Sequence, residues 1–438
     1  MSSEVGRGDI LRPIQSPSKS YFAVLAVVLA VIGVWVFGYI QQLRYGLIVT
    51  GLGDWGSGGG VPWGVYIGSY IWWIGIAHGG IILSAAVRLI DLDTYQPVAR
   101  LAELLTIASL SMAGLFILLH VGRPDRLVTS IVLTWPWRVN WSPLQWDVTV
   151  VTLYFVLTAT YLGLTLRYDI HRLHAQLPDR FEPLYRLLLI GYSEDEDEIV
   201  ERMVWWLALA IIILAPLLLH GGVIPWLFAL LPSMAGWFGG VQGPSFLSIA
   251  LSSAVSGIII VAAAFRRAYG WEELFPMEIF RGLAKWLGFF GLLFLWLQLQ
   301  QILPGVLAAP VSISEATQVK LSTPLYWLAI GFIIVAEAYI FASALKPSLF
   351  TIRRMVTVGL MVLVGTLVEK VLFVVEGLQE PIFSLYRNVP GVYTPSWIEL
   401  SAVLGTIAMV VLFFMVVSKV IPVVELHTVE DNHPEVEE

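Results

Sequence analysis

Long apolar runs recur along this chain and determine the solvent in which it can fold. Runs near or above the roughly 20 residues that a helix needs to cross a bilayer fall at 21–40, 65–90, 101–120, 147–166, 203–231, 246–266, 282–303, 325–345, 355–375 and 397–422. Hydrophobic residues make up 58% of the chain and charged residues 13%, which excludes a soluble globular domain. Because backbone polar groups in lipid must be satisfied within the segment, we expect an all-α integral membrane protein with about ten transmembrane helices.

The domain organisation follows from the same pattern. Residues 1–20 form a polar N-terminal segment, residues 21–422 the ten-helix domain and residues 423–438 an acidic tail. The first apolar run ends without a small-residue cleavage site, so we expect it to remain as the first helix. The tail and an acidic run at 193–201 supply much of the net charge of -7, and we expect both to be solvated surface.

Ten crossings place both termini on one side of the membrane. With the loops after even-numbered helices and the two termini counted together, that side carries about 18 Lys and Arg residues against about 7 on the other side. The positive-inside rule therefore predicts cytoplasmic termini. The loops at 51–64, 120–147 and 390–397 are then expected on the outer face.

Ionisable side chains within spans cost roughly 2.5–3.5 kcal/mol to insert and tend to mark ion or proton paths. The candidates for proton transfer are His78, Glu103, Glu337, Glu369 and Glu399. Their different depths suggest a route from the cytoplasm toward an outer pocket. Glu369 is followed by Lys370, so a neutralised pair is the alternative at that position.

His120 ends the third run and Asp147 begins the fourth, and the outer loop between them contains Arg123. A quinol needs a hydrogen-bond acceptor at each hydroxyl and a base that titrates near neutral pH, which an imidazole oriented by a carboxylate supplies. The alternative is an interfacial histidine and a helix-capping aspartate. Trp146 adjoins the pair, as one of many tryptophans that either form an interfacial belt or line a site for a flat ring.

The chain has no cysteine, which excludes disulfides and any all-cysteine zinc or iron–sulfur site within it. Haem ligation would require two histidines at one depth, and only His120 and His220 could meet in the outer half. We therefore expect no metal, haem or iron–sulfur cluster here. The sequence contains no phosphate loop or other signal for a nucleotide, and we expect no nucleic-acid partner.

Several motifs resemble a known family. The segments PWGVYIGSYIWWIGIAHGG (62–80) and HVGRPDRL (120–127), the region of Ser142, Pro143 and Asp147, and two later segments at 351–378 and 393–427 are similar to NrfD/PsrC-like membrane subunits of quinone-linked oxidoreductases. The last segment is particularly similar to the ten-helix branch, which includes ActC and ActF of alternative complex III and the HybB-type subunit of membrane-bound hydrogenases.

The resemblance implies two four-helix bundles, helices two to five and six to nine, flanked by the outer helices. It also implies a menaquinone or ubiquinone pocket near the outer face of a prokaryotic cytoplasmic membrane, with His120, Asp147 and Arg123 at the matching positions. The implied partners are membrane lipid, a four-cluster ferredoxin-like iron–sulfur subunit and a molybdopterin-type, hydrogenase or cytochrome subunit.

The function expected from the sequence is therefore that of a quinone-interacting membrane anchor that exchanges electrons with an iron–sulfur subunit and is coupled, as a further hypothesis, to proton translocation. Ten spans with intramembrane carboxylates also suit a secondary transporter. A structural anchor without quinone reactivity is the third possibility.

Overall fold

The computed structural model describes residues 10–15, 18–52, 62–138, 143–193, 197–215, 224–231, 233–307, 309–379 and 393–426. These residues form helices and no β-strand. Nine helices within the described ranges are long and apolar enough to cross a membrane: α3 (Lys19–Tyr45), α4 (Val65–Leu89), α5 (Gln96–Val121), α8 (Pro143–Leu173), α12 (Gln242–Tyr269), α13 (Met277–Leu307), α15 (Pro324–Leu345), α16 (Ile352–Gln379) and α18 (Trp397–Val417). The predicted all-α multi-pass membrane class is confirmed.

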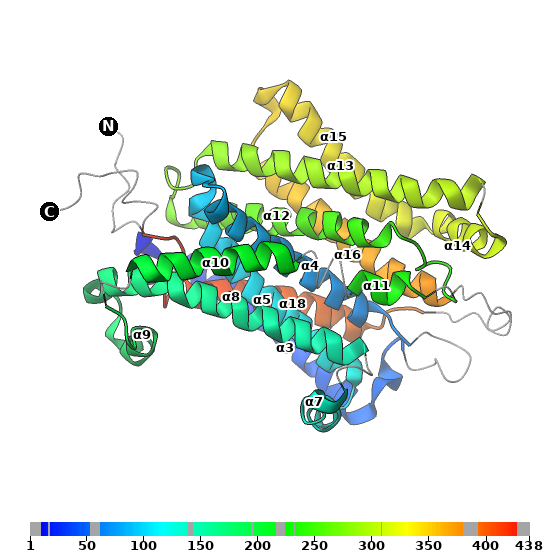
Figure 1. The fold of residues 1–438 in the computed structure, drawn as a ribbon, viewed down its shortest axis with the longest axis horizontal. Coiled ribbons are helices and arrows are strands. Elements are labelled where there is room, and N and C mark those ends of the chain that lie inside the picture. Colours follow the sequence, from blue (N-terminus) through cyan, green and yellow to red (C-terminus); the bar gives the residue numbers. More distant parts are fainter. Residues whose placement is uncertain are drawn as a thin grey trace.

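The run predicted at 203–231 is described in two pieces, α10 (Asp197–Ala215) and α11 (Ile224–Ala229). Residues 216–223, among them His220, lie outside the described residues, as do 1–9, 53–61, 139–142, 380–392 and 427–438, which include parts of the expected outer loops and both termini. The chain crosses the helix stack between the end of α8 and the start of α12, because these two points lie at opposite ends of the stack (Figure 1).

The first and last described segments lie at the same end of the stack. Arg12 donates a hydrogen bond to the carbonyl of Tyr269 (3.1 Å), where α12 ends, and Glu425 forms an ion pair with Arg88, where α4 ends. We call this the proximal end, and the opposite one, with α11 and α14 (Val311–Ser322), the distal end. An even number of crossings follows, consistent with ten.

Contacts between helices divide the molecule into the predicted parts. Helices α4, α5, α8 and α10 pack around one another as the first bundle, and α12, α13, α15 and α16 as the second. Helices α3 and α18 pack together and flank the first bundle through α4 and α5. The two expected four-helix bundles with flanking helices are confirmed.

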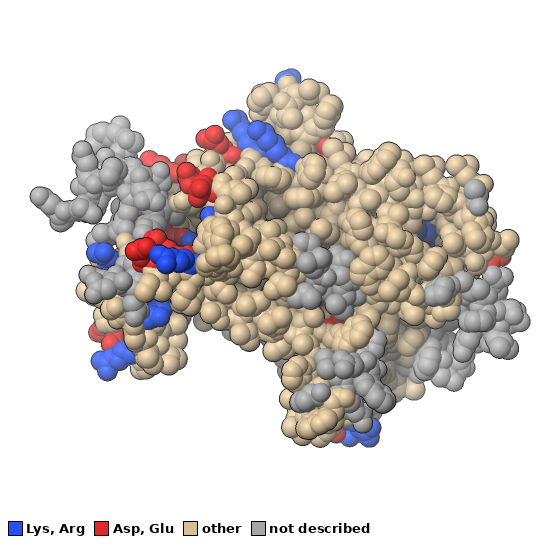
Figure 2. All heavy atoms as spheres, in the orientation of Figure 1, with Lys and Arg blue, Asp and Glu red and all other residues tan. Residues whose placement is uncertain are grey.

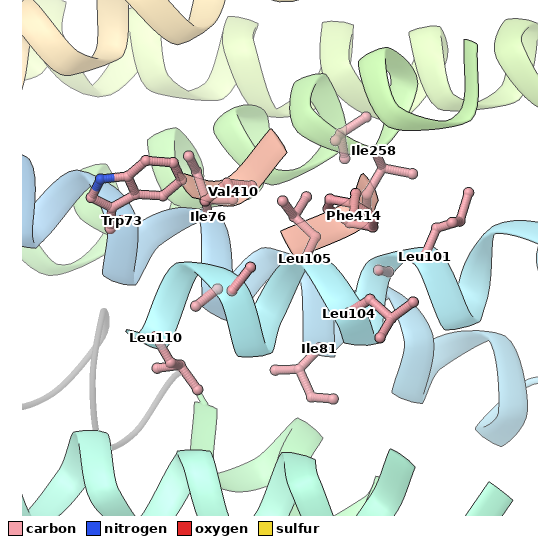
Figure 3. Packing of buried hydrophobic residues seen from close by; sticks show 14 of the residues in the cluster. Trp73, Ile76, Ile81, Leu101, Leu104, Leu105, Leu110, Ile258, Val410 and Phe414 are labelled. Carbon is pink, nitrogen blue, oxygen red and sulfur yellow. The ribbon is translucent and has the colours of Figure 1, made fainter. Parts of the chain in front are cut away.

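Small residues on α4 allow the two bundles to approach closely, as is typical of membrane helices. A Cβ atom added at Gly79 would clash with the Ala254 side chain and lie 3.1 Å from the Ala250 carbonyl, both on α12. A Cβ at Gly68 would lie 2.9 Å from the backbone nitrogen of Val371 on α16. Figure 3 shows the apolar core at this junction, where side chains from α4, α5, α12 and α18 interdigitate.

Local sequence explains where several helices begin and end. Ser18 caps α3 by accepting a hydrogen bond from the Tyr21 backbone N–H (3.2 Å), and Ser396 with Glu399 forms a capping box at the start of α18. Gly122 and Gly270 end α5 and α12 in the left-handed conformation, with φ of 69° and 67°, which favours glycine.

Charge is distributed as a membrane protein requires. On the face drawn in Figure 2, Lys, Arg, Asp and Glu gather mainly at the proximal end, whereas the middle of the molecule is almost uncharged. Tryptophans of the distal end are exposed, as the interfacial belt predicts: Trp135 42%, Trp137 76%, Trp327 53% and Trp397 51%.

Candidate functional site

Three side chains of the first bundle place buried polar atoms near its distal end: Tyr70, His120 and Asp147. Tyr70 of α4 is 3% exposed, and its hydroxyl lies next to the carboxyl group of Asp147 on α8. Within the described residues, Nδ1 of His120, near the end of α5, has no hydrogen-bond partner. The Tyr70 hydroxyl and Asp147 Oδ1 have no further partner beyond the contact between Tyr70 and Asp147 itself. Each unpaired buried group costs about 1–3 kcal/mol, so a ligand or water that bonds these atoms would recover that energy.

The predicted pair is thus brought to one end of one bundle, although no hydrogen bond or ion pair joins His120 to Asp147 within the described part of the chain. Tyr70 is the link that sequence reasoning missed. Tyr70 lies in the SYIWW run of α4, where an aromatic residue in a sequence of apolar residues gives no sign of a polar contact.

The two other residues predicted for the pocket point elsewhere. Arg123 forms a bidentate ion pair with Asp125, at 2.9 and 2.8 Å, and its side chain is 64% exposed. Trp146 is 42% exposed, like the tryptophans of the belt. Neither is assigned to the buried cluster.

Helix α8 continues the cluster as a polar stripe. Asp147, Tyr154, Thr158, Tyr161 and Asp169 recur at spacings that place them on one face of a helix. The last four are at most 1% exposed. At a rise of about 1.5 Å per residue the stripe is about 33 Å long, which matches the thickness of the hydrocarbon core.

His78 of α4 contacts this stripe at Tyr154, about a third of the way from Asp147 to Asp169. It is 1% exposed, and its ring packs edge-on against Tyr154, with ring centroids 5.1 Å apart. Nδ1 lies 2.9 Å from the carbonyl of Ile74. A carbonyl only accepts, so Nδ1 carries a proton and Nε2 is the atom that can take up a second one.

Glu103 of α5 lies farther toward the proximal end. It is fully buried, accepts a hydrogen bond from Ser84 (2.6 Å), and lies 3.7 Å from the guanidinium of Arg88. Arg88 in turn lies over the ring of Tyr161, 5.4 Å from its centroid. The stripe on α8, His78 and Glu103 together form what we call the polar column of the first bundle.

Buried charges close the proximal end of the column. Arg100 is 1% exposed and forms an ion pair with Asp169 of α8. Glu425 pairs with Arg88 and lies 3.8 Å from Arg100. Residues Val423, Val424 and Leu426 are fully buried. Residues 423–426, assigned from the sequence to a solvated acidic tail, are therefore part of the packed protein, because Glu425 lies beside the buried Arg100 and the partly buried Arg88 and neutralises their charge.

A cavity of about 510 Å³ reaches this charged network at the proximal end. Arg88, Arg100, Asp169 and Glu425 line it together with the exposed Glu201 of α10. Water in this cavity would contact Arg88, the neighbour of Glu103. The cavity therefore reaches the proximal end of the polar column.

The remaining predicted proton carriers belong to other parts of the molecule. Glu337 of α15 is 6% exposed, and its Oε1 has no partner in the described structure; it fits against Gly291 of α13. Glu369 forms an ion pair with Lys370 (3.0 Å) and accepts a hydrogen bond from Gln298 (3.4 Å). Both glutamates lie in the second bundle, separate from the column.

Glu399 caps the start of α18. Its carboxylate accepts hydrogen bonds from the Gly51 N–H (2.7 Å), the Ser396 N–H (2.8 Å) and the Tyr393 hydroxyl (2.6 Å). Tyr393 also accepts from the Val65 N–H (2.7 Å). Glu399 therefore ties the start of α4 to the start of α18, and we do not include it in a proton route.

A repeated motif shows which residues of the second bundle correspond to the histidine and aspartate of the first. SPLQWD at 142–147 recurs as TPLYWL at 323–328, so Leu328 stands in the place of Asp147. Gln301 precedes the proline of its copy by the same number of residues as His120. Gln301 lines a distal cavity of about 310 Å³ in the second bundle. That cavity lacks the proton-accepting pair.

Comparison with known proteins agrees with this architecture. The family model described as "Polysulphide reductase, NrfD" matches residues 55–381. The chain belongs to the NrfD family. The match includes both bundles, the polar column and the His120–Asp147 end.

Three relatives are similar over nearly their whole length. A putative dimethyl sulfoxide reductase membrane subunit of Halobacterium salinarum is 27% identical, over 95% of this chain and 94% of its own. A selenate reductase subunit of Mesobacillus selenatarsenatis is 25% identical, over 92% and 94%. An "Hdr-like menaquinol oxidoreductase integral membrane subunit" of Archaeoglobus fulgidus is 23% identical, over 96% and 98%.

Proposed function

We propose that this NrfD-family chain is the quinol-binding membrane subunit of a multisubunit oxidoreductase. The observation that carries the proposal is the set of buried polar atoms at the distal end of the first bundle: His120 Nδ1, which has no partner in the described structure, and Asp147 Oδ1 with the Tyr70 hydroxyl, which have none beyond their mutual contact. A quinol headgroup fits this set, because its hydroxyls donate to the imidazole and the carboxylate, and a quinone carbonyl can accept from tyrosine. The relative named as a menaquinol oxidoreductase subunit supports menaquinol as the substrate.

Oxidation of one quinol releases two protons and two electrons. Asp147 and His120 each accept one proton, since both have an unpaired buried atom facing away from other partners in the described structure. Tyr70 orients the Asp147 carboxyl group. The electrons leave to a docked iron–sulfur subunit of the four-cluster ferredoxin-like class, because a chain without cysteine cannot supply the thiolates of such clusters.

The direction of electron flow is proposed from the relatives. Two of them are named as subunits of reductases, which supports quinol oxidation here and delivery of electrons to a reductase catalytic subunit. The termini are proposed to be cytoplasmic, in agreement with the distribution of Lys and Arg. The quinol end of the column then faces the outside.

We further propose that the polar column conducts protons between the cavity at Glu425 and the quinol end. Glu103, His78 and Tyr154 are the internal stations. Their spacing leaves gaps that ordered water would have to bridge, and the unpartnered hydroxyls of Tyr154 and Thr158 within the described chain are suitable sites for such water. Glu337 and Glu369 are assigned to no step of this route.

The test begins with purification in mild detergent, identification of the copurifying subunits and measurement of binding of a quinol analogue. His120→Ala and Asp147→Asn should each weaken binding at least about tenfold, as loss of a charge-assisted hydrogen bond predicts. His174→Ala is the matched control, because His174 is 42% exposed on the proximal side, paired with Glu182. If no iron–sulfur subunit copurified, or if all variants bound the quinol analogue equally, the proposal would be wrong and the transporter or the structural anchor would be favoured.

A further inference from the structure

A second feature of the molecule suits a ligand that is unrelated to quinol. At the proximal end, a groove of about 630 Å³ lies between α3 and α18, the flanking pair, and α12 of the second bundle. Its lining changes from basic and hydroxyl groups at the end of these helices to apolar side chains toward the middle of the molecule. No predicted site residue lines this groove.

The polar end of the groove contains two cations and several hydroxyls. Arg12 and Lys419 line it together with Ser18, Ser20 and Tyr21. The Lys419 ammonium donates a hydrogen bond to the Pro13 carbonyl and lies 4.8 Å from the centre of the Tyr21 ring. Ser18 and Ser20 are both exposed. These groups together present donors suited to phosphate oxygens.

Lys419 is half-buried, and its contacts within the described part of the chain are the Pro13 carbonyl and the rings of Tyr21 and Tyr269, with no carboxylate among them. Burial and the nearby Arg180 lower the pKa of Lys419, because each disfavours the charged ammonium. An anion bound beside Lys419 would stabilise the ammonium, and so the local charge is complementary to a negatively charged group.

The apolar part of the groove opens toward lipid. Val24 of α3 is 48% exposed and Val411 of α18 is 39% exposed, and Ala264 of α12 is also exposed. From Lys419 to Val410, and from Tyr269 to Ile260, the lining residues extend along their helices for about 13 Å. That length is close to half of the roughly 30 Å hydrocarbon core, which is one leaflet.

We propose that this groove binds one anionic phospholipid, with its phosphate between Arg12 and Lys419 and one acyl chain along Ala264 and Val411. Cations at the level of the headgroups, above an apolar groove one leaflet deep, match an amphiphile of this charge. The lipid bridges the flanking pair and the second bundle. It therefore contributes to holding α3, whose membrane-crossing window is only 17% buried within the protein.

The test compares phosphatidylglycerol with phosphatidylcholine of the same acyl chains, titrated onto the delipidated full-length protein with its subunits and counted by native mass spectrometry. Each interfacial cation contributes about fivefold to binding of an anionic lipid. One phosphatidylglycerol should therefore bind about 25-fold more tightly than phosphatidylcholine. Lys419→Gln should reduce that preference about fivefold while retaining a donor for the Pro13 carbonyl.

Two matched controls separate the site from general effects. Ala264→Trp fills the groove and should weaken binding of both lipids, whereas Ala344→Trp, on an equally exposed alanine at the proximal end of α15, should not. Lys346→Gln removes an exposed charge at the same level and should leave the preference unchanged. Equal binding of both lipids by the unsubstituted protein would overturn the proposal. So would displacement of phosphatidylglycerol by inorganic phosphate at constant ionic strength, which would indicate a site for free anions.

Discussion

Asp147 and Asp169 lie on the same face of α8, and we expect the first to act in quinol oxidation and the second to stabilise the fold. The same substitution at the two positions should therefore affect activity in one case and stability in the other. Asp169 forms an ion pair with Arg100, and the two side chains are 2% and 1% exposed. Asp147 has no cationic partner in the described structure, and its Oδ1 is unpaired. Replacement of either residue with asparagine preserves the size of the side chain, removes the charge and turns one acceptor oxygen into a donor NH2 group.

The structure sets the expected magnitudes. Loss of one partner from a buried ion pair costs about 3–5 kcal/mol. Arg100 would retain Glu425 at 3.8 Å and the Thr165 carbonyl at 3.2 Å, so Asp169→Asn should lower the free energy of unfolding by an amount near the lower limit, about 3 kcal/mol. Asp147→Asn breaks no ion pair and should change it by less than about 1 kcal/mol, yet it should abolish most quinol oxidation.

The assay is unfolding in mixed micelles titrated with sodium dodecyl sulfate, followed by circular dichroism, together with quinol oxidation by the intact complex. Asp179→Asn, at the exposed start of the short 3-10 helix Asp179–Phe181 that follows α8, controls for the general effect of losing a carboxylate. If Asp147→Asn destabilised the protein as much as Asp169→Asn, or left turnover intact, the assignment of the distal aspartate to chemistry and the proximal one to structure would be wrong.

Three further predictions follow from separate features. Glu103→Gln retains the acceptor for Ser84 but loses a group that can carry a proton. It should therefore slow the passage of quinol protons through the column to the proximal side of reconstituted vesicles at least about tenfold, with unchanged binding of quinol analogues. Unchanged proton release on that side would contradict the proton route. Gly79→Val should lower the free energy of unfolding by about 1–3 kcal/mol, because the added side chain overpacks against Ala254. The same change at Gly33, where an added Cβ has no neighbour within 4 Å, should lower it less. Chemical unfolding of the two variants would measure the difference. Because the pKa of Lys419 lies below that of an ordinary lysine, the preference for phosphatidylglycerol should fall as the pH rises and its ammonium deprotonates. Bound lipid favours the ammonium and shifts this loss to higher pH. A preference that does not change between neutral pH and pH 11 would exclude Lys419 as its source.

The sequence predicted the membrane class and most helix ranges with considerable accuracy, and the family resemblance implied the division into two bundles. A helix in lipid must satisfy its own backbone, so hydropathy alone marks where each span lies. The start of α18 was also readable, since Ser396 and Glu399 have the spacing of a capping box. That same spacing could have indicated that Glu399 is a cap and not a proton carrier.

The buried charges were harder to recognise. Arg88, Arg100 and Asp169 lie near the proximal ends of their helices, where charged residues usually reach the aqueous phase, and Glu425 follows the last apolar run. Only their tertiary arrangement pairs Glu425 with Arg88 and Asp169 with Arg100. The stripe on α8 was available as a helical periodicity of polar residues, but its membership in a continuous column depends on His78 and Glu103 from neighbouring helices.

The sequence by itself therefore determined that the chain crosses a membrane about ten times, and it placed a histidine and an aspartate at consecutive helix ends. The tertiary structure decided which polar residues share an interior: it joined Tyr70 to Asp147, left Arg123 outside on Asp125 and separated Glu337 and Glu369 into the second bundle. The physical reason is that crossing a bilayer is a property of one segment's transfer into lipid, whereas a site requires side chains from several helices, whose faces are oriented only by packing.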